Sequence, residues 1–143
     1  MNMNDQNFGE FLQTKREQQK ITLRQLAEKL DLSAPFLSDV EKGRRNSLDM
    51  DRLVMLRQIL NLSDEEYETM LNLAGKQRKT VAPDLPEYIM ERDYVSAALR
   101  TARDLDAGEA EWQRFVEELK KRKGWTTIHV YSHYQNQAEW TAY

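Results

Sequence analysis

With 143 residues, 40% of them hydrophobic and 31% charged, the chain has room for one moderate domain or for a small domain with an appendage. No apolar run approaches the ~20 residues needed to cross a bilayer, and the amino terminus lacks the basic-then-apolar order of a signal peptide, so we expect a cytoplasmic protein without a membrane segment. The lack of cysteine excludes disulfides and cysteine-ligated metal, and the net charge of −3 provides no general attraction to nucleic acid.

The first predicted element is a helix over residues 8–19. Phe8, Phe11 and Leu12 begin its apolar face, and Lys15 and Arg16 fall in its last turns. We expect this helix to support the following segment from behind.

A short amphipathic helix is predicted to follow Thr22. The Thr22 side chain is placed as an N-cap, and Gln25 three residues later closes a capping box. Four apolar residues then recur at i, i+3, i+4 and i+7, which is the spacing of one helix face: Leu23, Leu26, Ala27 and Leu30.

A second helix is predicted over residues 34–42, after a turn at residues 31–32, with Ser33 as its N-cap and Gly43 at the position after its C-cap. On a helical wheel the apolar side chains share one side: Phe36, Leu37 and Val40. The other side carries small and polar side chains: Ala34, Pro35, Ser38, Asp39 and Lys42. A short helix that buries one face and presents the other has the geometry of a major-groove reader.

The pattern LSxxxLSxxEKGRR in residues 32–45 is the most specific part of this region. On it, residues 8–75 resemble the Cro/C1-type (XRE family, lambda repressor-like) helix-turn-helix DNA-binding domain. The resemblance implies five helices, operator binding as a dimer and regulation of transcription. It also implies an ion pair between Arg16 and Glu41, which would tie the first helix to the recognition helix.

We expect DNA recognition to be divided among these helices and the loop that follows them. Thr22 and Gln25 would anchor the first motif helix on the DNA backbone. The base-facing residues would be Ala34, Pro35, Ser38 and Asp39, and the phosphate contacts would come from Lys42, Arg44 and Arg45.

Ala34 and Pro35 offer no hydrogen-bonding side chain, so they can only contact a thymine methyl or read DNA shape. Asp39 would repel phosphate, but it can accept a hydrogen bond from cytosine N4 or hold Arg44 or Lys42 in position.

Two further helices are predicted over residues 48–60 and from Ser63 to Gly75. Ser63 forms a capping box with Glu66, and Gly75 is placed to end the second helix. The expected core residues are Leu48, Leu53, Leu56, Ile59, Leu60, Tyr67, Met70, Leu71 and Ala74.

A basic run and two prolines within residues 76–86 mark the best boundary in the chain. We therefore expect a DNA-binding domain over residues 1–79, a linker over 80–86, a further helical module over 87–124 and a tail over 125–143. Up to Thr80 the chain has 13 basic and 13 acidic residues, against 8 and 11 in the remainder. Positive charge for DNA must then be placed locally or doubled by dimerisation.

The module after the boundary reads as a helical hairpin. One helix is predicted from Pro86 to near Asp106, and a second over residues 109–123, separated by a break at residues 107–108. Helices this short cannot bury their apolar and aromatic faces alone, so we expect this module to mediate oligomerisation, to bind a partner protein, or to pack on the first domain. The helix dipole is sufficient to explain the cations at its end: Lys120, Lys121, Arg122 and Lys123.

The tail over residues 125–143 is short and aromatic. Its alternation around residues 128–131 is typical of a strand, and it could dock as an arm or fray. His129 and His133 are four apart, but no carboxylate cluster completes a metal site, so no metal and no cofactor is expected.

The sequence as a whole predicts an all-α, sequence-specific DNA-binding transcriptional regulator, acting as a repressor homodimer on a two-fold operator in double-stranded DNA. We expect no enzyme, because the chain has no glycine-rich phosphate loop, no GxSxG turn and no cysteine nucleophile. Two alternatives stay open. One is an antitoxin-like DNA-binding protein whose residues 86–143 bind a partner protein; the other is a helix-turn-helix fold that no longer binds DNA.

Overall fold

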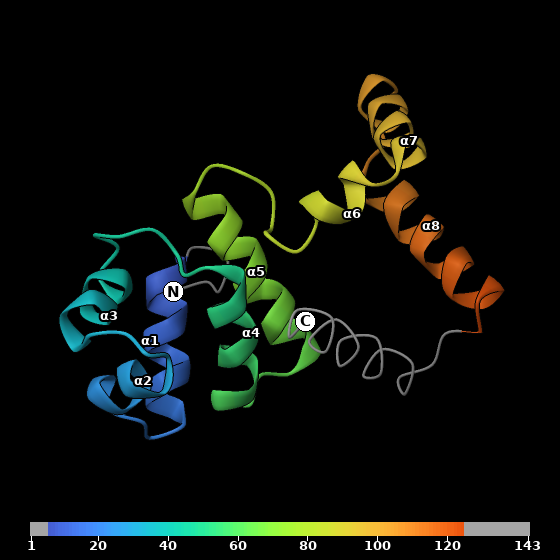
Figure 1. The fold of residues 1–143 in the computed structure, drawn as a ribbon. Coiled ribbons are helices and arrows are strands. Elements are labelled where there is room, and N and C mark those ends of the chain that lie inside the picture. Colours follow the sequence, from blue (N-terminus) through green and yellow to red (C-terminus); the bar gives the residue numbers. More distant parts are fainter. Residues whose placement is uncertain (1–5, 125–143) are drawn as a thin grey trace. The chain divides into compact units, whose positions relative to one another are not determined.

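The computed structural model describes residues 6–124, and every regular element in that range is an α-helix (Figure 1). The described part of the chain holds eight helices, which confirms the predicted all-α class for those residues. The aromatic tail predicted over residues 125–143 lies outside the described residues. The helices belong to two compact units that divide between Pro86 and Glu87. We call the described residues 6–86 the head and 87–124 the appendage.

Five helices build the head, and a side chain caps the start of each. The helices are α1 Phe8–Gln18, α2 Leu23–Lys29, α3 Ala34–Glu41, α4 Met50–Ile59 and α5 Asp64–Gln77. The capping side chains belong to Asn7, Thr22, Ser33, Asp49 and Ser63. Each accepts a hydrogen bond from a first-turn N–H that would otherwise lack a partner. The capping boxes predicted at Thr22 and Ser63 are confirmed.

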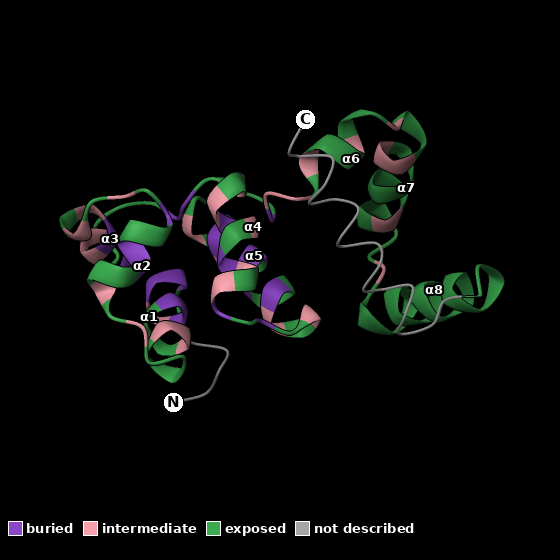
Figure 2. Cartoon of the chain, turned by 60° about the horizontal axis from the view of Figure 1, so that its bottom comes forward, coloured by how far each residue is buried: buried purple, intermediate pink, exposed green. Residues whose placement is uncertain are grey.

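The core of the head is formed by apolar side chains from all five helices, and the buried residues of these helices are coloured purple in the cartoon of Figure 2. Fully buried members are Phe8, Leu12, Leu26, Leu37, Leu53, Leu56, Met70 and Leu71. The core residues predicted for α4 and α5 are buried, except Ile59, which is half-exposed. Leu62 and Ala82 also join the core, although the sequence did not single them out.

Gly75 has a different role from the one predicted. It does not end α5, which runs on to Gln77. A Cβ at this position would lie 2.5 Å from the Val81 carbonyl oxygen, so the missing side chain lets residues 81–82 pack against the helix. The helix ends instead with Lys79 in the left-handed region at φ 57°, and the Thr80 N–H donates to the Gly75 carbonyl at 2.9 Å.

The appendage contains α7 Asp93–Asp104, α8 Glu109–Arg122 and all of α6 Pro86–Met90 except its first residue, which belongs to the head. None of its described residues is buried, and Figure 2 shows it in green and pink. Large apolar side chains stay exposed along these helices: Tyr88, Met90, Tyr94, Leu99, Leu105, Trp112, Phe115, Val116 and Leu119.

The single helix predicted from Pro86 to near Asp106 is wrong, because the chain breaks between α6 and α7. Arg92 leaves the helical region at φ −136° and ψ 93°. Its guanidinium donates to the Tyr88 carbonyl at 3.2 Å and lies 4.2 Å from the centroid of the Tyr88 ring. The Arg92 side chain thereby satisfies a carbonyl that the end of α6 leaves free, and α7 begins anew.

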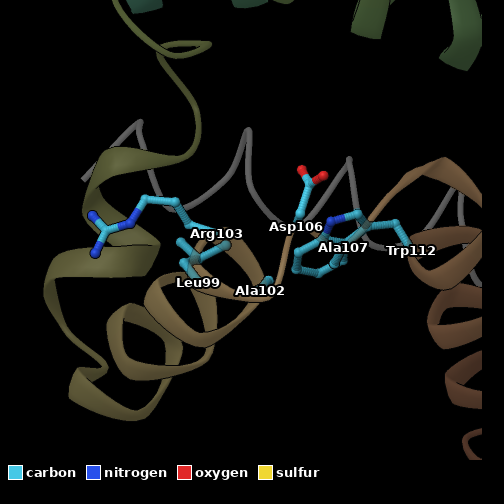
Figure 3. Close-up of a pocket in the computed structure, with 6 residues that line it drawn as sticks. All are labelled: Leu99, Ala102, Arg103, Asp106, Ala107 and Trp112. Atoms are coloured by element: carbon cyan, nitrogen blue, oxygen red, sulfur yellow. The ribbon is translucent and has the colours of Figure 1, made fainter.

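A tight turn joins α7 to α8, and the two helices diverge from it (Figure 1). Asp106 takes the left-handed conformation at φ 54°, and the Gly108 N–H donates to the Glu111 carboxylate at 2.9 Å to begin α8. Within the described residues the two helices do not pack along their lengths as a closed hairpin would. They share a shallow hollow near the turn, with Leu99 and Ala102 on one side and Trp112 on the other (Figure 3).

Candidate nucleic-acid interface

The second motif helix, α3, packs against α1 and α2. Leu37 and Val40 on its inner side are fully buried, as the helical wheel predicted. Phe36, predicted for the same buried face, is only half-buried and lies at its edge. On the outer side Pro35 is exposed, and three further side chains are half-buried: Ala34, Ser38 and Asp39. The helix thus keeps one apolar face in the core and leaves a shallow surface of small and polar groups open.

The capping box at the start of α2 uses the side-chain oxygens of Thr22 and Gln25 as acceptors, and it leaves their side-chain hydrogen-bond donors available to a ligand. Thr22 Oγ1 accepts from the Gln25 N–H at 3.1 Å, and Gln25 Oε1 accepts from the Thr22 N–H at 2.9 Å. The Thr22 hydroxyl proton and the two side-chain Nε2–H groups of Gln25 take no part in this box. Both residues are exposed. The start of α2 can therefore donate hydrogen bonds to an anion such as a phosphate.

The ion pair implied for Arg16 and Glu41 is present and links α1 to the end of α3. Arg16 Nε and Nη2 donate to the two Glu41 carboxylate oxygens at 2.8 and 3.0 Å, and Nη1 donates to the Ile21 carbonyl at 3.0 Å. Only 12% and 6% of the two side chains are exposed. The hydrogen bond to Glu41 raises the pKa of Arg16 above its ordinary value, so the buried guanidinium stays charged.

Gly9 sets how closely α1 approaches α3. A Cβ at Gly9 would lie 2.3 Å from the Glu41 carbonyl oxygen and 2.7 Å from that of Val40. Any side chain here would push the two backbones apart and move the recognition helix. No periodic or capping pattern marks this glycine in the sequence, because the need for it arises only where the two helices meet.

Asp39 holds the two arginines of the loop after α3. Its carboxylate lies 3.5 Å from Arg44 Nη1 and 3.9 Å from Arg45 Nε, and its carbonyl accepts from both their N–H groups at 2.8 and 3.3 Å. The Arg45 guanidinium also lies 4.7 Å from the centroid of the half-buried Phe36 ring. The arginine side chains remain 68% and 56% exposed. They are oriented by α3 yet open to a ligand.

The far end of the same loop is fastened to α5. Ser47 is buried, and its hydroxyl donates to the Ala74 carbonyl at 3.2 Å. Arg78 Nε donates to the Ser47 hydroxyl at 3.0 Å and its Nη2 to the Ser47 carbonyl, while Gln77 Nε2 donates to the Arg45 carbonyl at 3.1 Å. Arg78 therefore fixes the loop that carries Arg44 and Arg45. The sequence predicted for Arg78 only a place in the basic run of the boundary segment, residues 76–86.

Local charge favours an anion although the whole chain is acidic. Two carboxylates belong to α3, and both already face cations: Glu41 faces Arg16, and Asp39 faces Arg44 and Arg45. Lys42 adds an exposed cation at the C-cap. Apart from the buried pair, α3 and residues 42–47 present three cations, Lys42, Arg44 and Arg45, against the single carboxylate of Asp39, so the surface is locally positive.

Other kinds of site have no support in the described residues. No group of three or more His, Asp or Glu side chains there is placed to hold a metal ion, and His129 and His133 lie outside that part of the chain. None of the helices in residues 6–124 is long and apolar enough to cross a membrane.

The arrangement of α2 and α3 defines a helix-turn-helix domain, with one capped helix leading into an exposed recognition helix. Residues 12–67 match the family model HTH_3, Helix-turn-helix. These residues form a Cro/C1-type (XRE) helix-turn-helix domain, which implies DNA binding, and the family is generally non-enzymatic. The match covers less than half of the chain and ends before the appendage. No curated protein and no solved structure matches the chain.

Proposed function

We propose that this protein is a sequence-specific transcriptional repressor of the cytoplasm that binds a two-fold operator as a homodimer. The observation that carries the proposal is the loop after α3. Its two exposed arginines are oriented by Asp39 and Phe36 at one end and by Arg78 at the other. Oriented cations beside an exposed helix suit a DNA duplex, because phosphate contacts fix the register in which the helix meets the bases.

The proposed contacts divide into three groups. Thr22 and Gln25 donate from the start of α2 to the DNA backbone. The outer surface of α3 faces the bases in the major groove through Ala34, Pro35, Ser38 and Asp39. Phosphates on the flanking strand are bound by Lys42, Arg44 and Arg45.

The first test is selection of binding sites from random duplex DNA by the full-length protein at two salt concentrations. A two-fold motif with half-sites about one helical turn apart is the expected result. If the protein loses its bound DNA at the higher salt concentration and no sequence motif is enriched, sequence-specific recognition is contradicted. This result would favour a head that binds DNA only weakly.

Substitutions separate the roles of the contact residues. Arg45→Ala should weaken binding to all sequences alike and reduce the salt slope by about one unit, whereas Ser38→Ala should change the preference at one base position. Arg100→Ala, which removes an exposed cation from α7 instead, is the matched control and should leave the slope unchanged. A wild-type slope for the Arg45 variant removes this residue from the contacts.

Asp39→Asn decides between two roles of that carboxylate. If Asp39 mainly orients Arg44 and Arg45, the variant binds all sequences more weakly. If its carboxylate accepts a hydrogen bond from a cytosine, the preference changes at one position only. Binding-site selection with this variant distinguishes the two results.

A second candidate function is favoured by the exposed apolar faces of α7 and α8. An antitoxin-like protein would use the appendage to bind and neutralise a partner protein while its head binds DNA. Co-purification of an unrelated protein with the full-length chain, lost on substitution of Trp112 and Phe115, would favour this function.

A further inference from the structure

The helix α8 carries an apolar stripe that the described residues leave about half exposed. Trp112, Phe115, Val116 and Leu119 follow the spacing i, i+3, i+4, i+7, and each is between 40% and 54% exposed. The Trp112 and Phe115 rings meet edge to face with centroids 6.1 Å apart, so the stripe is a pre-formed surface. Exposed stripes of this kind mark interaction surfaces.

The distribution of charge along α8 indicates which partner surface would be complementary to the stripe. Glu109 and Glu111 lie in the first turn, and the last turn carries Lys120, Lys121 and Arg122. The ends are roughly 17 Å apart along the axis, so they cannot neutralise each other within one helix. The helix dipole favours this arrangement of charge but leaves the stripe uncovered.

We propose that α8 pairs in antiparallel orientation with α8 of a second copy of this chain. A two-fold axis between Phe115 and Val116 brings Trp112 level with Leu119 of the second copy. Along the two edges of the stripe, Glu109 then lies beside Lys120 of the second copy and Glu111 beside its Arg122, each pair offset by only about 3 Å along the axis. A parallel pair would instead place glutamates against glutamates and cations against cations.

The hollow beside Trp112 extends this surface onto α7. Leu99 and Ala102 of α7 line it together with Trp112, and Figure 3 shows these side chains around the start of α8. Leu119 of the second copy would lie next to this hollow. Apolar area on α7 is needed as well, because two 14-residue helices alone are marginal in water.

This inference rests on the proposed homodimer and names the surface that forms it. It is tested without DNA, so a failure of DNA recognition leaves it standing, and its own failure leaves DNA recognition by the head standing.

Single cysteines provide the decisive experiment, because the natural chain has none. In the antiparallel pair the two copies of residue 116 lie close to the axis, with Cα atoms within the ~7 Å that a disulfide allows. The two copies of residue 119 are offset along the helices by roughly 10 Å. Under mild oxidation, full-length Val116→Cys should become a covalent dimer and full-length Leu119→Cys should not. Equal cross-linking of both variants indicates a parallel pair, and no cross-linking of Val116→Cys indicates another occupant of the stripe; either result overturns the proposal.

Charge reversal gives an independent readout by sedimentation equilibrium of the full chain. Glu109→Lys with Glu111→Lys, or Lys120→Glu with Arg122→Glu, should each weaken self-association roughly a hundredfold, because like charges then meet at both ends. Mixing the two variants should restore a dimer that contains one copy of each. A monomeric wild-type chain, as expected if α8 is covered within its own chain or binds only another protein, overturns the proposal. So does wild-type self-association of both variants.

Discussion

The head and the appendage are built from the same kind of amphipathic helix, yet only one of them has a core. In the head, apolar stripes from α1 to α5 converge and bury residues such as Leu37 and Leu56 completely. In the appendage, α7 and α8 have stripes of equal regularity, and none of their residues is buried. Amphipathic spacing therefore predicts a helix and the face it will bury, but not whether the partner lies in the same chain.

The largest expected effect concerns the ion pairs of the two units. Glu41→Ala leaves Arg16 charged and without its partner in the head, which should lower the free energy of unfolding by about 3–5 kcal/mol. Asp104→Ala in the appendage removes an exposed pair with Arg103, so the change should stay below about 0.5 kcal/mol. Urea denaturation measures both. Similar values for the two variants would contradict the contrast between buried and exposed pairs.

The same substitution, leucine to alanine, can be made in both units to compare how much each unit gains from a buried leucine. Leu56→Ala removes a fully buried side chain and should cost about 2–5 kcal/mol. Leu119 is 41% exposed, and Leu119→Ala should cost less than about 1 kcal/mol in dilute solution, because much of its surface already meets water. Thermal and urea unfolding at several protein concentrations are the measurement. A cost for Leu119→Ala that grows with concentration would indicate burial between copies.

Glycine substitution compares a packed backbone with an open one. Gly9→Ala should cost about 1–3 kcal/mol, because its Cβ meets main-chain atoms of α3 that cannot move alone. Gly108→Ala meets only the flexible end of the Glu111 side chain, at 3.2 Å, and should change stability by less than about 1 kcal/mol. The Gly9 variant should also bind DNA more weakly than its loss of stability explains, since α3 is displaced. A stable Gly9→Ala protein with unchanged DNA binding would show that the α1–α3 contact can relax.

The smallest expected effect lies at the edge of the head, where residues 80–86 pack on α5. Burial, with repulsion from Glu68, raises the pKa of Asp84 above its ordinary value of 3.8, and Oδ1 of Asp84 is buried without a hydrogen-bond partner among the described residues. The folded state thus holds this proton more tightly than the unfolded state does. The stability that Asp84 contributes through this tighter proton binding is lost as the pH rises from 3.8 through the raised pKa of the folded state.

Asp84→Asn removes that penalty and should stabilise the protein at pH 7 by less than about 1 kcal/mol, because water screens the half-exposed side chain. The advantage should disappear below pH 3.8, where the carboxyl is protonated in both states. Urea midpoints across the pH range test this. A variant without advantage at neutral pH would mean that residues 80–86 do not hold Asp84 against the head.

Much of the head could be predicted from the sequence because its signals are local. A capping residue and its partner are three positions apart, as for Thr22 with Gln25 and Ser63 with Glu66. The left-handed Gly43, at φ 77°, follows the C-cap of α3 by one position. The ion pair of Arg16 with Glu41 spans 25 positions and was reached through the family resemblance alone. The DNA-contacting roles of the exposed residues on α2 and α3 stay predictions for the experiments above.

Two features could not be predicted from local sequence patterns, because each depends on a contact with a segment that is distant in the chain. Gly75 looked like the end of a helix, but it is the place where the backbone at residue 81 returns to α5. Arg78 stood in the sequence as one cation of the basic run at the domain boundary, but it binds Ser47, which lies 31 positions earlier in the chain.

The sequence by itself determined where four of the five helices of the head begin, which of their faces are apolar and that residues 8–75 resemble a helix-turn-helix domain, because these properties depend on residues within one or two turns of each other; α4, predicted from residue 48, begins at Met50 after the Asp49 cap. Only the tertiary structure decided which glycines allow another backbone segment to approach closely, which arginine holds the loop after α3, and which apolar stripes are buried in a core. Close approach and long-range pairing arise when distant segments meet, and no local pattern encodes that meeting.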